Sequence, residues 1–273
     1  MFLTKLRKPV DTYVPWLGHS YRTLRDLTSW RLPRQTAYGF QLAGDARMAH
    51  PDFEASEAQA FLRQCETHDV VLDIGANVGF YSCLAASRGK QVLAFEPAPR
   101  NLKFLYRNLW SNGFTAVEIF PVGLGAKPGL MPIYGSGGIS SFVPGWAQAS
   151  KNGSHFAPVE ALDLVLGGRF PGQHLFIKMD VEGFELDVLG GARDVLGRDP
   201  KPTWMVEILL HDVAIPGGIS TRFCDTFEAY WSNNYRCEAL GPNAFEVSRE
   251  QVERWTAKGS VERGVHNFLF TAR

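Results

Sequence analysis

From about residue 70 onward, short apolar runs alternate with amphipathic segments. Helical patterns cover Phe80–Ser87 and the stretch 101–110, where the apolar side chains fall on one face. The runs between them predict five strands: Val70–Ile74, Gln91–Phe95, Val117–Val122, Leu175–Met179 and Thr203–Ile208. Parallel strands need helical crossovers between them. The alternation therefore predicts an α/β protein with a doubly wound, parallel, Rossmann-like sheet.

The flanking segments add smaller elements. The stretch 36–44 predicts a hairpin and 55–65 a helix, and near the C-terminus two strand candidates, 235–240 and 266–272, flank a helix over about 248–257. Residues 124–160 contain too much glycine and proline for a helix. They predict short strands and turns at the mouth of the sheet, where loops often carry substrate contacts.

The N-terminal stretch differs in character from the rest. Residues 1–34 carry a net charge of +5, so the remainder carries −5, and leucine and tyrosine residues between positions 17 and 27 have helical spacing. We divide the chain into a basic, aromatic extension, 1–55, and a main domain, 56–273. The extension is expected to cap the cofactor, contact an acceptor or pack against a second subunit, and peripheral contact with an anionic membrane is the alternative.

Composition excludes several classes of protein. Of the 273 residues, 45% are apolar and 21% charged, which is typical of a globular protein, and the formal net charge of zero does not favour a nucleic-acid partner. The four cysteines form no C-x-x-C pair, so free thiols are expected. No apolar run reaches the ~18 residues of a membrane span, and the N-terminus lacks the apolar core of a signal peptide. We expect a cytoplasmic protein without a transmembrane segment.

The first predicted strand leads into a glycine-containing turn, "LDIGANVGFYS". Gly75 and Gly79 are placed as in a nucleotide-binding loop, but Asn77 stands where a dinucleotide motif has its second glycine. Asp73, just before the turn, would repel a pyrophosphate. A cationic ligand without phosphate suits this loop better, and S-adenosyl-L-methionine carries an ammonium and a sulfonium group.

A second carboxylate supports this interpretation. Glu96 ends the next predicted strand, where a carboxylate can accept hydrogen bonds from both ribose hydroxyls of an adenosine. Together these residues predict an S-adenosyl-L-methionine site, and a nicotinamide-dependent dehydrogenase is the weaker alternative.

Several motifs occur in a familiar order. The chain contains "DIGANVGFYS", "FEPAPRNLKFLYRNL", "VGLG", "VEALD", "IKMDVEGFELDVLGGA" and "VEI". Over about residues 55–271 it resembles the FkbM family of class I S-adenosyl-L-methionine-dependent methyltransferases. The resemblance implies a seven-stranded sheet whose last strand is antiparallel. It also implies O-methylation, often of a sugar hydroxyl in a glycan, glycolipid or glycosylated metabolite, or of a polyketide hydroxyl. The matching positions implied as cofactor or substrate contacts are Pro97, Gly123, Ser140 and Ser141.

A second acidic segment, 177–191, follows the fourth predicted strand. Asp180 would point into the cleft, where it could bind the amino group of the cofactor, orient the acceptor hydroxyl or take its proton. Glu182 is a further candidate for the base or for a substrate contact. Glu185 is expected to favour the first turn of the next helix through the helix dipole.

Two more candidates follow the fifth predicted strand. Glu207 ends it, and His211 lies four residues on. Either could serve as the base, or with Asp180 they could bind a divalent cation that lowers the pKa of the hydroxyl. We favour a reaction without a metal. The other histidines considered are expected to be ordinary surface or buried residues: His155, His174 and His266.

Two functional hypotheses from different classes follow. The first is an O-methyltransferase that acts on a small-molecule or glycan acceptor, and the second is a non-catalytic S-adenosyl-L-methionine-binding partner protein. Carboxylates at the cleft favour the enzyme, because a binding protein has no chemical need for them. A homo-oligomer is compatible with either hypothesis.

Overall fold

The computed structural model describes residues 33–44, 46–135, 140–146, 155–212, 218–241, 244–262 and 265–273. Contacts divide the chain into two compact units, Met1–Phe53 and Glu54–Arg273. In the first unit, β1 (Arg34–Gln35) and β2 (Gln41–Leu42) form the predicted hairpin, and the 3-10 helix η1 (Ala46–Ala49) follows. The helix predicted between residues 17 and 27 lies outside the described residues.

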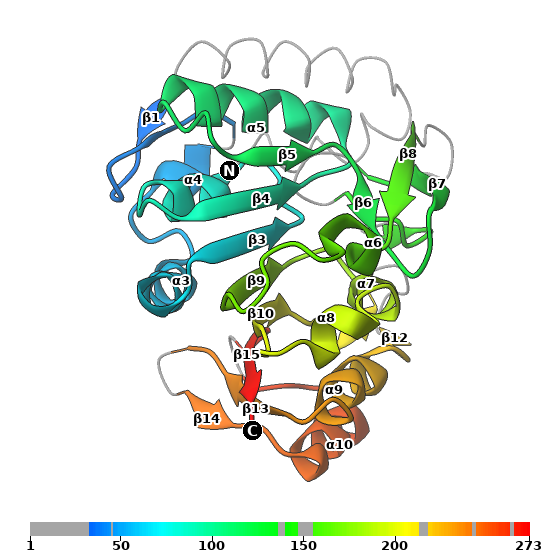
Figure 1. Ribbon diagram of the computed structural model, residues 1–273. Coiled ribbons are helices and arrows are strands. Elements are labelled where there is room, and N and C mark those ends of the chain that lie inside the picture. The colour runs from blue at the N-terminus through cyan, green and yellow to red at the C-terminus, as the bar shows by residue number, and fades with distance from the viewer. Residues whose placement is uncertain are drawn as a thin grey trace, which may run out of the picture. The chain divides into compact units, whose positions relative to one another are not determined.

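The second unit is built on an eight-stranded sheet of order β14-β13-β15-β10-β9-β3-β4-β5 (Figure 1). The strands β3, β4, β5, β9 and β10 are mutually parallel, whereas β15 runs antiparallel to both of its neighbours. The bounds are β3 (Val70–Ile74), β4 (Gln91–Phe95), β5 (Glu118–Phe120), β9 (Leu175–Met179), β10 (Thr203–Glu207), β13 (Tyr235–Ala239), β14 (Phe245–Glu246) and β15 (Asn267–Ala272). The doubly wound sheet and the antiparallel last strand are confirmed. The predicted count of seven strands is one short, because the two-residue β14 pairs with β13 at the edge.

Helices connect the strands and cover the sheet (Figure 1). Their bounds are α3 (Ala55–Thr67), α4 (Phe80–Ala86), α5 (Pro99–Ser111), α6 (Leu162–Leu166), α7 (Glu185–Gly190), α8 (Arg193–Gly197), α9 (Phe223–Trp231) and α10 (Arg249–Lys258). Each predicted helix in the second unit is present, with ends shifted by up to two residues. The helix predicted over 101–110 begins earlier because Pro99 fits the first helical position.

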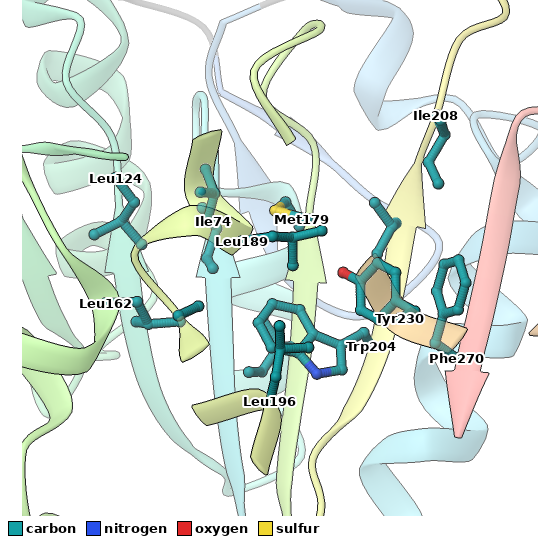
Figure 2. Close-up of a cluster of buried hydrophobic side chains, with 14 of the residues drawn as sticks. Ile74, Leu124, Leu162, Met179, Leu189, Leu196, Trp204, Ile208, Tyr230 and Phe270 are labelled. Atoms are coloured by element: carbon teal, nitrogen blue, oxygen red, sulfur yellow. The ribbon is translucent and has the colours of Figure 1, made fainter. Parts of the chain in front are cut away.

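Alternating residues of the buried strands face different layers. On one face, apolar side chains such as Ile74, Met179 and Trp204 pack with residues of α6 to α9 in the main hydrophobic core (Figure 2). On the other face, Phe176 packs against Phe61 of α3 at a ring-centroid distance of 5.0 Å. Both faces are therefore covered, which explains why these strands read as nearly continuous apolar runs.

The segment between α5 and α6 forms a small sheet beside the mouth of the main one. Strands β6 (Gly123–Leu124), β7 (Gly129–Ile133) and β8 (His155–Glu160) pair in the order β6-β8-β7. This agrees with the short strands predicted for 124–160. A second small hairpin, β11 (His211–Asp212) with β12 (Gly218–Ile219), follows β10.

Two further expectations concern thiols and membranes. All four cysteines are unpaired, as predicted. Within the described residues, no helix combines the length and apolar character that a membrane crossing requires.

Candidate functional site

The turn between β3 and α4 is held against the end of β9. Gly75 has a φ of +83°, and a Cβ placed there would lie 1.9 Å from the carbonyl oxygen of Asp180, so only glycine fits. Asn77 also has a left-handed backbone, with φ 51°. This conformation directs its N–H to a carboxylate oxygen of Glu96 at 2.8 Å. The turn is therefore shaped by both neighbouring strands.

Glu96 is buried at the carboxyl end of β4, with 4% of its surface exposed. Its Oε2 accepts the Asn77 N–H and its Oε1 accepts the N–H of Ala98, each at 2.8 Å. Burial raises the pKa of Glu96 to about 7, although these two hydrogen bonds oppose the shift. The Asn101 side chain is a third donor to this carboxylate, which has about four acceptor sites, so Glu96 can still accept a hydrogen bond from a ligand.

A pocket opens beyond the carboxyl ends of β3, β4 and β9. Among its described lining residues, the ionisable side chains are all acidic: Glu96, Asp180 and Glu182. The other predicted site residues that line it are Gly75, Asn77, Pro97, Gly123, Ser140 and Ser141. Nine of the predicted positions thus come together around one cavity.

Asp73 and Gly79, both predicted as cofactor contacts, are not among the residues that line this pocket. Asp73 is 2% exposed and accepts a hydrogen bond from the Ser82 hydroxyl of α4 at 2.5 Å. At Gly79, a Cβ would lie 2.6 Å from a methyl carbon of Leu105, so this glycine allows α4 and α5 to approach each other. Both residues support the turn from behind.

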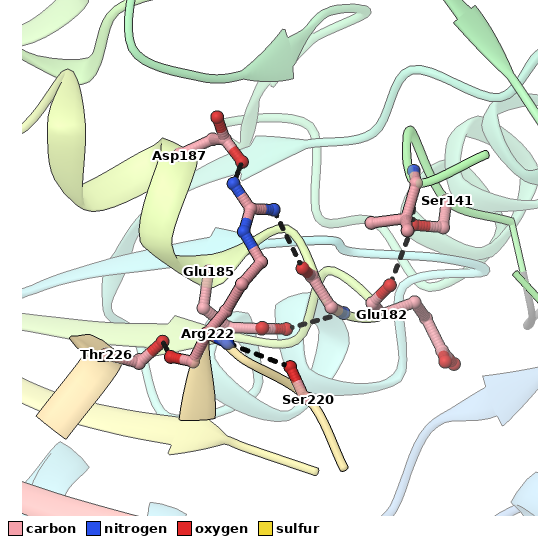
Figure 3. A network of polar contacts seen from close by, with 9 residues as sticks. Ser141, Glu182, Glu185, Asp187, Ser220, Arg222 and Thr226 are labelled. Atoms are coloured by element: carbon pink, nitrogen blue, oxygen red, sulfur yellow. Dashed lines mark hydrogen bonds and ion pairs between the residues drawn. The ribbon is translucent and has the colours of Figure 1, made fainter. Parts of the chain in front are cut away.

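Two residues of the small-sheet segment contact the turn after β9. The Ser141 hydroxyl donates to the backbone oxygen of Glu182 at 2.7 Å, and the Trp146 indole N–H donates to its Oε2 at 2.9 Å. Figure 3 shows Ser141 directed toward Glu182. Burial is the main cause that raises the pKa of Glu182, followed by repulsion from Asp180, while the Trp146 hydrogen bond opposes the shift. Ser141 therefore has a structural role in addition to any contact with substrate.

Asp180 follows β9 beside a buried lysine. The ammonium of Lys178 lies 3.4 Å from Oδ2 of Asp180, and Lys178 is only 2% exposed. On the neighbouring strand, Val206 is in register with Met179, so Glu207 ends β10 next to Asp180. Burial and the negative charge of Asp180 raise the pKa of Glu207. Of these three residues, Asp180 lines the pocket.

His211 lies elsewhere. It lines a smaller pocket of about 380 Å³, on the far side of the turn after β9, together with Arg222 and Glu185. In Figure 3, Arg222 reaches Asp187, with which it forms an ion pair, and the turn after β9. No group of three or more histidine, cysteine or acidic side chains in the described part of the chain is arranged to hold a metal ion. The metal site considered for Asp180, Glu207 and His211 is thus not assembled.

Two residues at this site were not predicted from the sequence. Lys178 carried a signal, because it is the one charged residue of the strand LFIKM, whose five positions are all buried. Trp146 carried none, because a tryptophan in a glycine-rich segment does not reveal its partner 36 residues away. Glu185, placed correctly at the start of α7, also accepts the Gly183 N–H at 2.9 Å, and burial raises its pKa to about 7.

Comparison with known proteins gives one curated relative and several solved structures. Over 152 residues the chain is 30% identical to the hexuronic acid methyltransferase AglP of Haloferax volcanii, covering 52% of this chain and 58% of that protein. The chain thus spans less than two thirds of the length of this relative. Similar structures include a TehB-like SAM-dependent methyltransferase from Corynebacterium glutamicum (TM-score 0.42, 15% identity, 80% of this chain and 88% of that one). Another is a SAM-dependent methyltransferase from Agrobacterium tumefaciens (TM-score 0.44, 11% identity, covering 88% of this chain and 69% of that one).

Residues 73–216 match the Methyltransferase FkbM domain, which is 144 of 273 residues and more than half of the chain. The match begins at Asp73 at the end of β3 and includes the acidic pocket and the turn after β9. The chain therefore belongs to the FkbM methyltransferase family.

Proposed function

We propose that this protein is an S-adenosyl-L-methionine-dependent O-methyltransferase that acts on a sugar hydroxyl. The observation that carries the proposal is the acidic pocket at the carboxyl ends of β3, β4 and β9, in which Glu96, Asp180 and Glu182 are the ionisable lining residues described. This charge disfavours phosphate-bearing cofactors and suits a cationic ligand. Membership of a methyltransferase family agrees with this choice.

The residues present fit the cofactor. Glu96 keeps room to accept a hydrogen bond from a ribose hydroxyl, because its carboxylate has about four acceptor sites and the described donors are the N–H groups of Asn77 and Ala98 and the Asn101 side chain. Gly75 lets the turn lie against β9, so that the backbone of the turn forms one wall of the pocket. Apolar residues, among them Phe95, Leu124 and Phe142, supply the surface on which an adenine can pack.

When bound, S-adenosyl-L-methionine supplies an electrophilic methyl group on a sulfonium. A sugar hydroxyl is a weak nucleophile, so a base that removes its proton as attack proceeds contributes about 10²- to 10⁴-fold. Asp180 fits this role best, because it lines the pocket and has an ammonium partner. Glu182 also lines the pocket, but Trp146 occupies one of its oxygens. Glu207 and His211 do not line it.

The relative AglP favours a carbohydrate acceptor over a polyketide hydroxyl, and its name points to a sugar that bears a carboxylate. We take a glycan or glycosylated metabolite containing a uronic acid as the first acceptor to test. As part of the same proposal, the protein works in the cytoplasm, as a monomer or homo-oligomer. The non-catalytic binding protein remains the alternative hypothesis.

The first test is calorimetry with three ligands. S-adenosyl-L-methionine and its demethylated product are expected to bind with micromolar or tighter affinity, and NAD is expected not to bind. NAD binding without S-adenosyl-L-methionine binding would contradict the cofactor assignment.

The second test supplies a radiolabelled methyl donor with uronic-acid-containing glycans and glycolipids, and with neutral glycans as the matched control. Label in an acceptor hydroxyl, lost in Asp180→Asn, supports the enzyme. Cofactor binding without transfer to any acceptor class would favour the binding protein.

A further inference from the structure

Lys178 is a buried cation in an otherwise apolar strand. It lies on the α3–α4 face of β9 with only 2% of its surface exposed. Its ammonium is 3.4 Å from Oδ2 of Asp180 and 5.1 Å from the centroid of the Tyr81 ring. Burying a lysine is costly unless it is paired, so its partners indicate why it is there.

Four carboxyl groups from different elements face this ammonium. Asp180 comes directly after β9, and Glu207 is the last residue of β10. Asp73 belongs to β3, and Glu54 precedes α3. Burial lowers the pKa of Lys178, but attraction by these groups outweighs burial and raises it. The ammonium therefore stays charged in an acidic surrounding.

Each of these carboxyl groups has a second partner, which for Asp180 is a side-chain hydrogen bond with Glu207. Glu54 accepts the Tyr81 hydroxyl at 2.6 Å, and Asp73 accepts the Ser82 hydroxyl at 2.5 Å. Oε1 of Glu207 lies 3.9 Å from Nε2 of His266. Of the four, Asp180 alone is both in ion-pair distance of Lys178 and part of the pocket wall.

We propose that Lys178 is a positioning residue for the methyl transfer, which holds the Asp180 carboxylate in its orientation at the wall of the pocket. This inference rests on the proposed function. Asp180 takes the proton as the acceptor O–H bond breaks. The electron pair of the oxygen forms the bond to the methyl carbon while the carbon–sulfur bond breaks, which leaves a neutral thioether. An apolar side chain at position 178 would fill the same space but would not orient the Asp180 carboxylate.

The first experiment compares Lys178→Met and Lys178→Arg with the matched control Lys201→Met. Lys201 also lies over a tyrosine ring, at 5.2 Å from the centroid of Tyr235, and donates to the backbone oxygens of Leu196 and Asn233, away from the pocket. In Lys178→Met, kcat is expected to fall about 50-fold or more, with the Kd for S-adenosyl-L-methionine changed by less than about threefold. Because the cation is gone, the acidic limb of the kcat–pH profile, along which the base loses its proton, should move to higher pH. Lys178→Arg should recover most of the rate, and Lys201→Met should leave it within about twofold.

A double-mutant cycle tests whether Lys178 acts through Asp180. If it does, Lys178→Met in the Asp180→Asn background should slow turnover by less than about threefold, far less than it does alone. Equal effects in both backgrounds, or a Lys178→Met enzyme with normal kcat and pH profile, would overturn the proposal.

A stability measurement keeps the inference testable even if no acceptor is found. In Lys178→Met the carboxyl groups around position 178 lose their cation, so they must ionise without compensation as pH rises. The loss in Tm relative to wild type should grow from roughly 3 °C at pH 5 to about 8 °C or more at pH 8, and Asp180→Asn should reverse part of the loss at pH 8. A loss that is the same at both pH values would show a packing role only. If Lys178→Met does not fold, Lys178→Gln takes its place in each measurement.

Discussion

The two sides of the pocket are organised differently. At Glu96 the backbone supplies the hydrogen-bond donors, and the turn that carries them is fixed by the lack of space at Gly75. At Asp180 the partner is a side chain, the buried Lys178. The Glu96 side should tolerate few changes in the shape of the turn. The Asp180 side should tolerate changes of shape, but not the loss of a charge. Binding and chemistry should therefore fail separately under mutation.

The largest effect on cofactor affinity is expected at the backbone side. Gly75→Ala places a methyl group 1.9 Å from the Asp180 carbonyl oxygen, so the turn must move away from β9. S-adenosyl-L-methionine affinity, measured by calorimetry, should fall at least ~100-fold, which corresponds to about 2.8 kcal/mol. Gly89→Ala is the control, because Gly89 also has a positive φ (+71°) but nothing lies within 4 Å of its Cβ position. If both variants lost the same affinity for S-adenosyl-L-methionine, the cause would be backbone strain and not the contact with Asp180.

The largest effect on turnover is expected at Asp180 and concerns the chemical step alone. Asp180→Asn keeps the size of the side chain and removes the base, so kcat should fall about 10²- to 10⁴-fold while the Kd for S-adenosyl-L-methionine changes only a few fold. The control Asp187→Asn breaks the ion pair with Arg222 outside the main pocket and should leave kcat within about threefold. Turnover that survives in Asp180→Asn would rule out Asp180 as the base.

The pH dependence of cofactor binding tests the role of Glu96. The pKa of Glu96 is raised to about 7, and ribose hydroxyls donate to its ionised form, so cofactor binding must release a proton below that pH. Affinity should weaken by up to ~10-fold for each pH unit below 7 and become constant above about pH 8. Glu96→Gln should lose this dependence. Calorimetry in buffers of different ionisation enthalpy would count the proton directly.

The smallest effect is expected at Trp146. Trp146→Phe keeps the ring but removes the N–H that donates to Glu182, so the pKa of Glu182 should rise further. The KM for the acceptor should change by roughly two- to fivefold, because a single hydrogen bond at a partly exposed site contributes about 1 kcal/mol. Trp110→Phe, at an exposed position on α5, is the control and should have no effect on KM.

Much of the fold was accessible from sequence because the β3–β10 core obeys local rules. Each of the strands β3, β4, β9 and β10 is a five-residue, mostly apolar run, and the glycines that follow β3 mark the turn. The extra strand β14 was not predicted, because its two residues, Phe245 and Glu246, carry no periodic pattern. Its existence depends on the edge of β13.

The site was predictable where one strand end defines one residue, as for Glu96 and Asp180. The site was less predictable where a residue contacts a partner that lies far away along the chain. Asp73 looked like a ligand contact, but its backbone direction turns the side chain toward Ser82. His211 was placed with Glu207 by sequence distance, whereas the chain leaves the sheet after β10 and carries it to another cavity.

The turn after β9 has a practical consequence for redesign. Its residue 182 is tethered by two donors from the small-sheet segment, and a Cβ at Gly183 would lie 2.4 Å from the Trp146 ring. A segment transplanted from a related enzyme to change acceptor preference would have to bring its own serine and tryptophan in matching positions. The small-sheet segment and the turn after β9 should therefore be exchanged together.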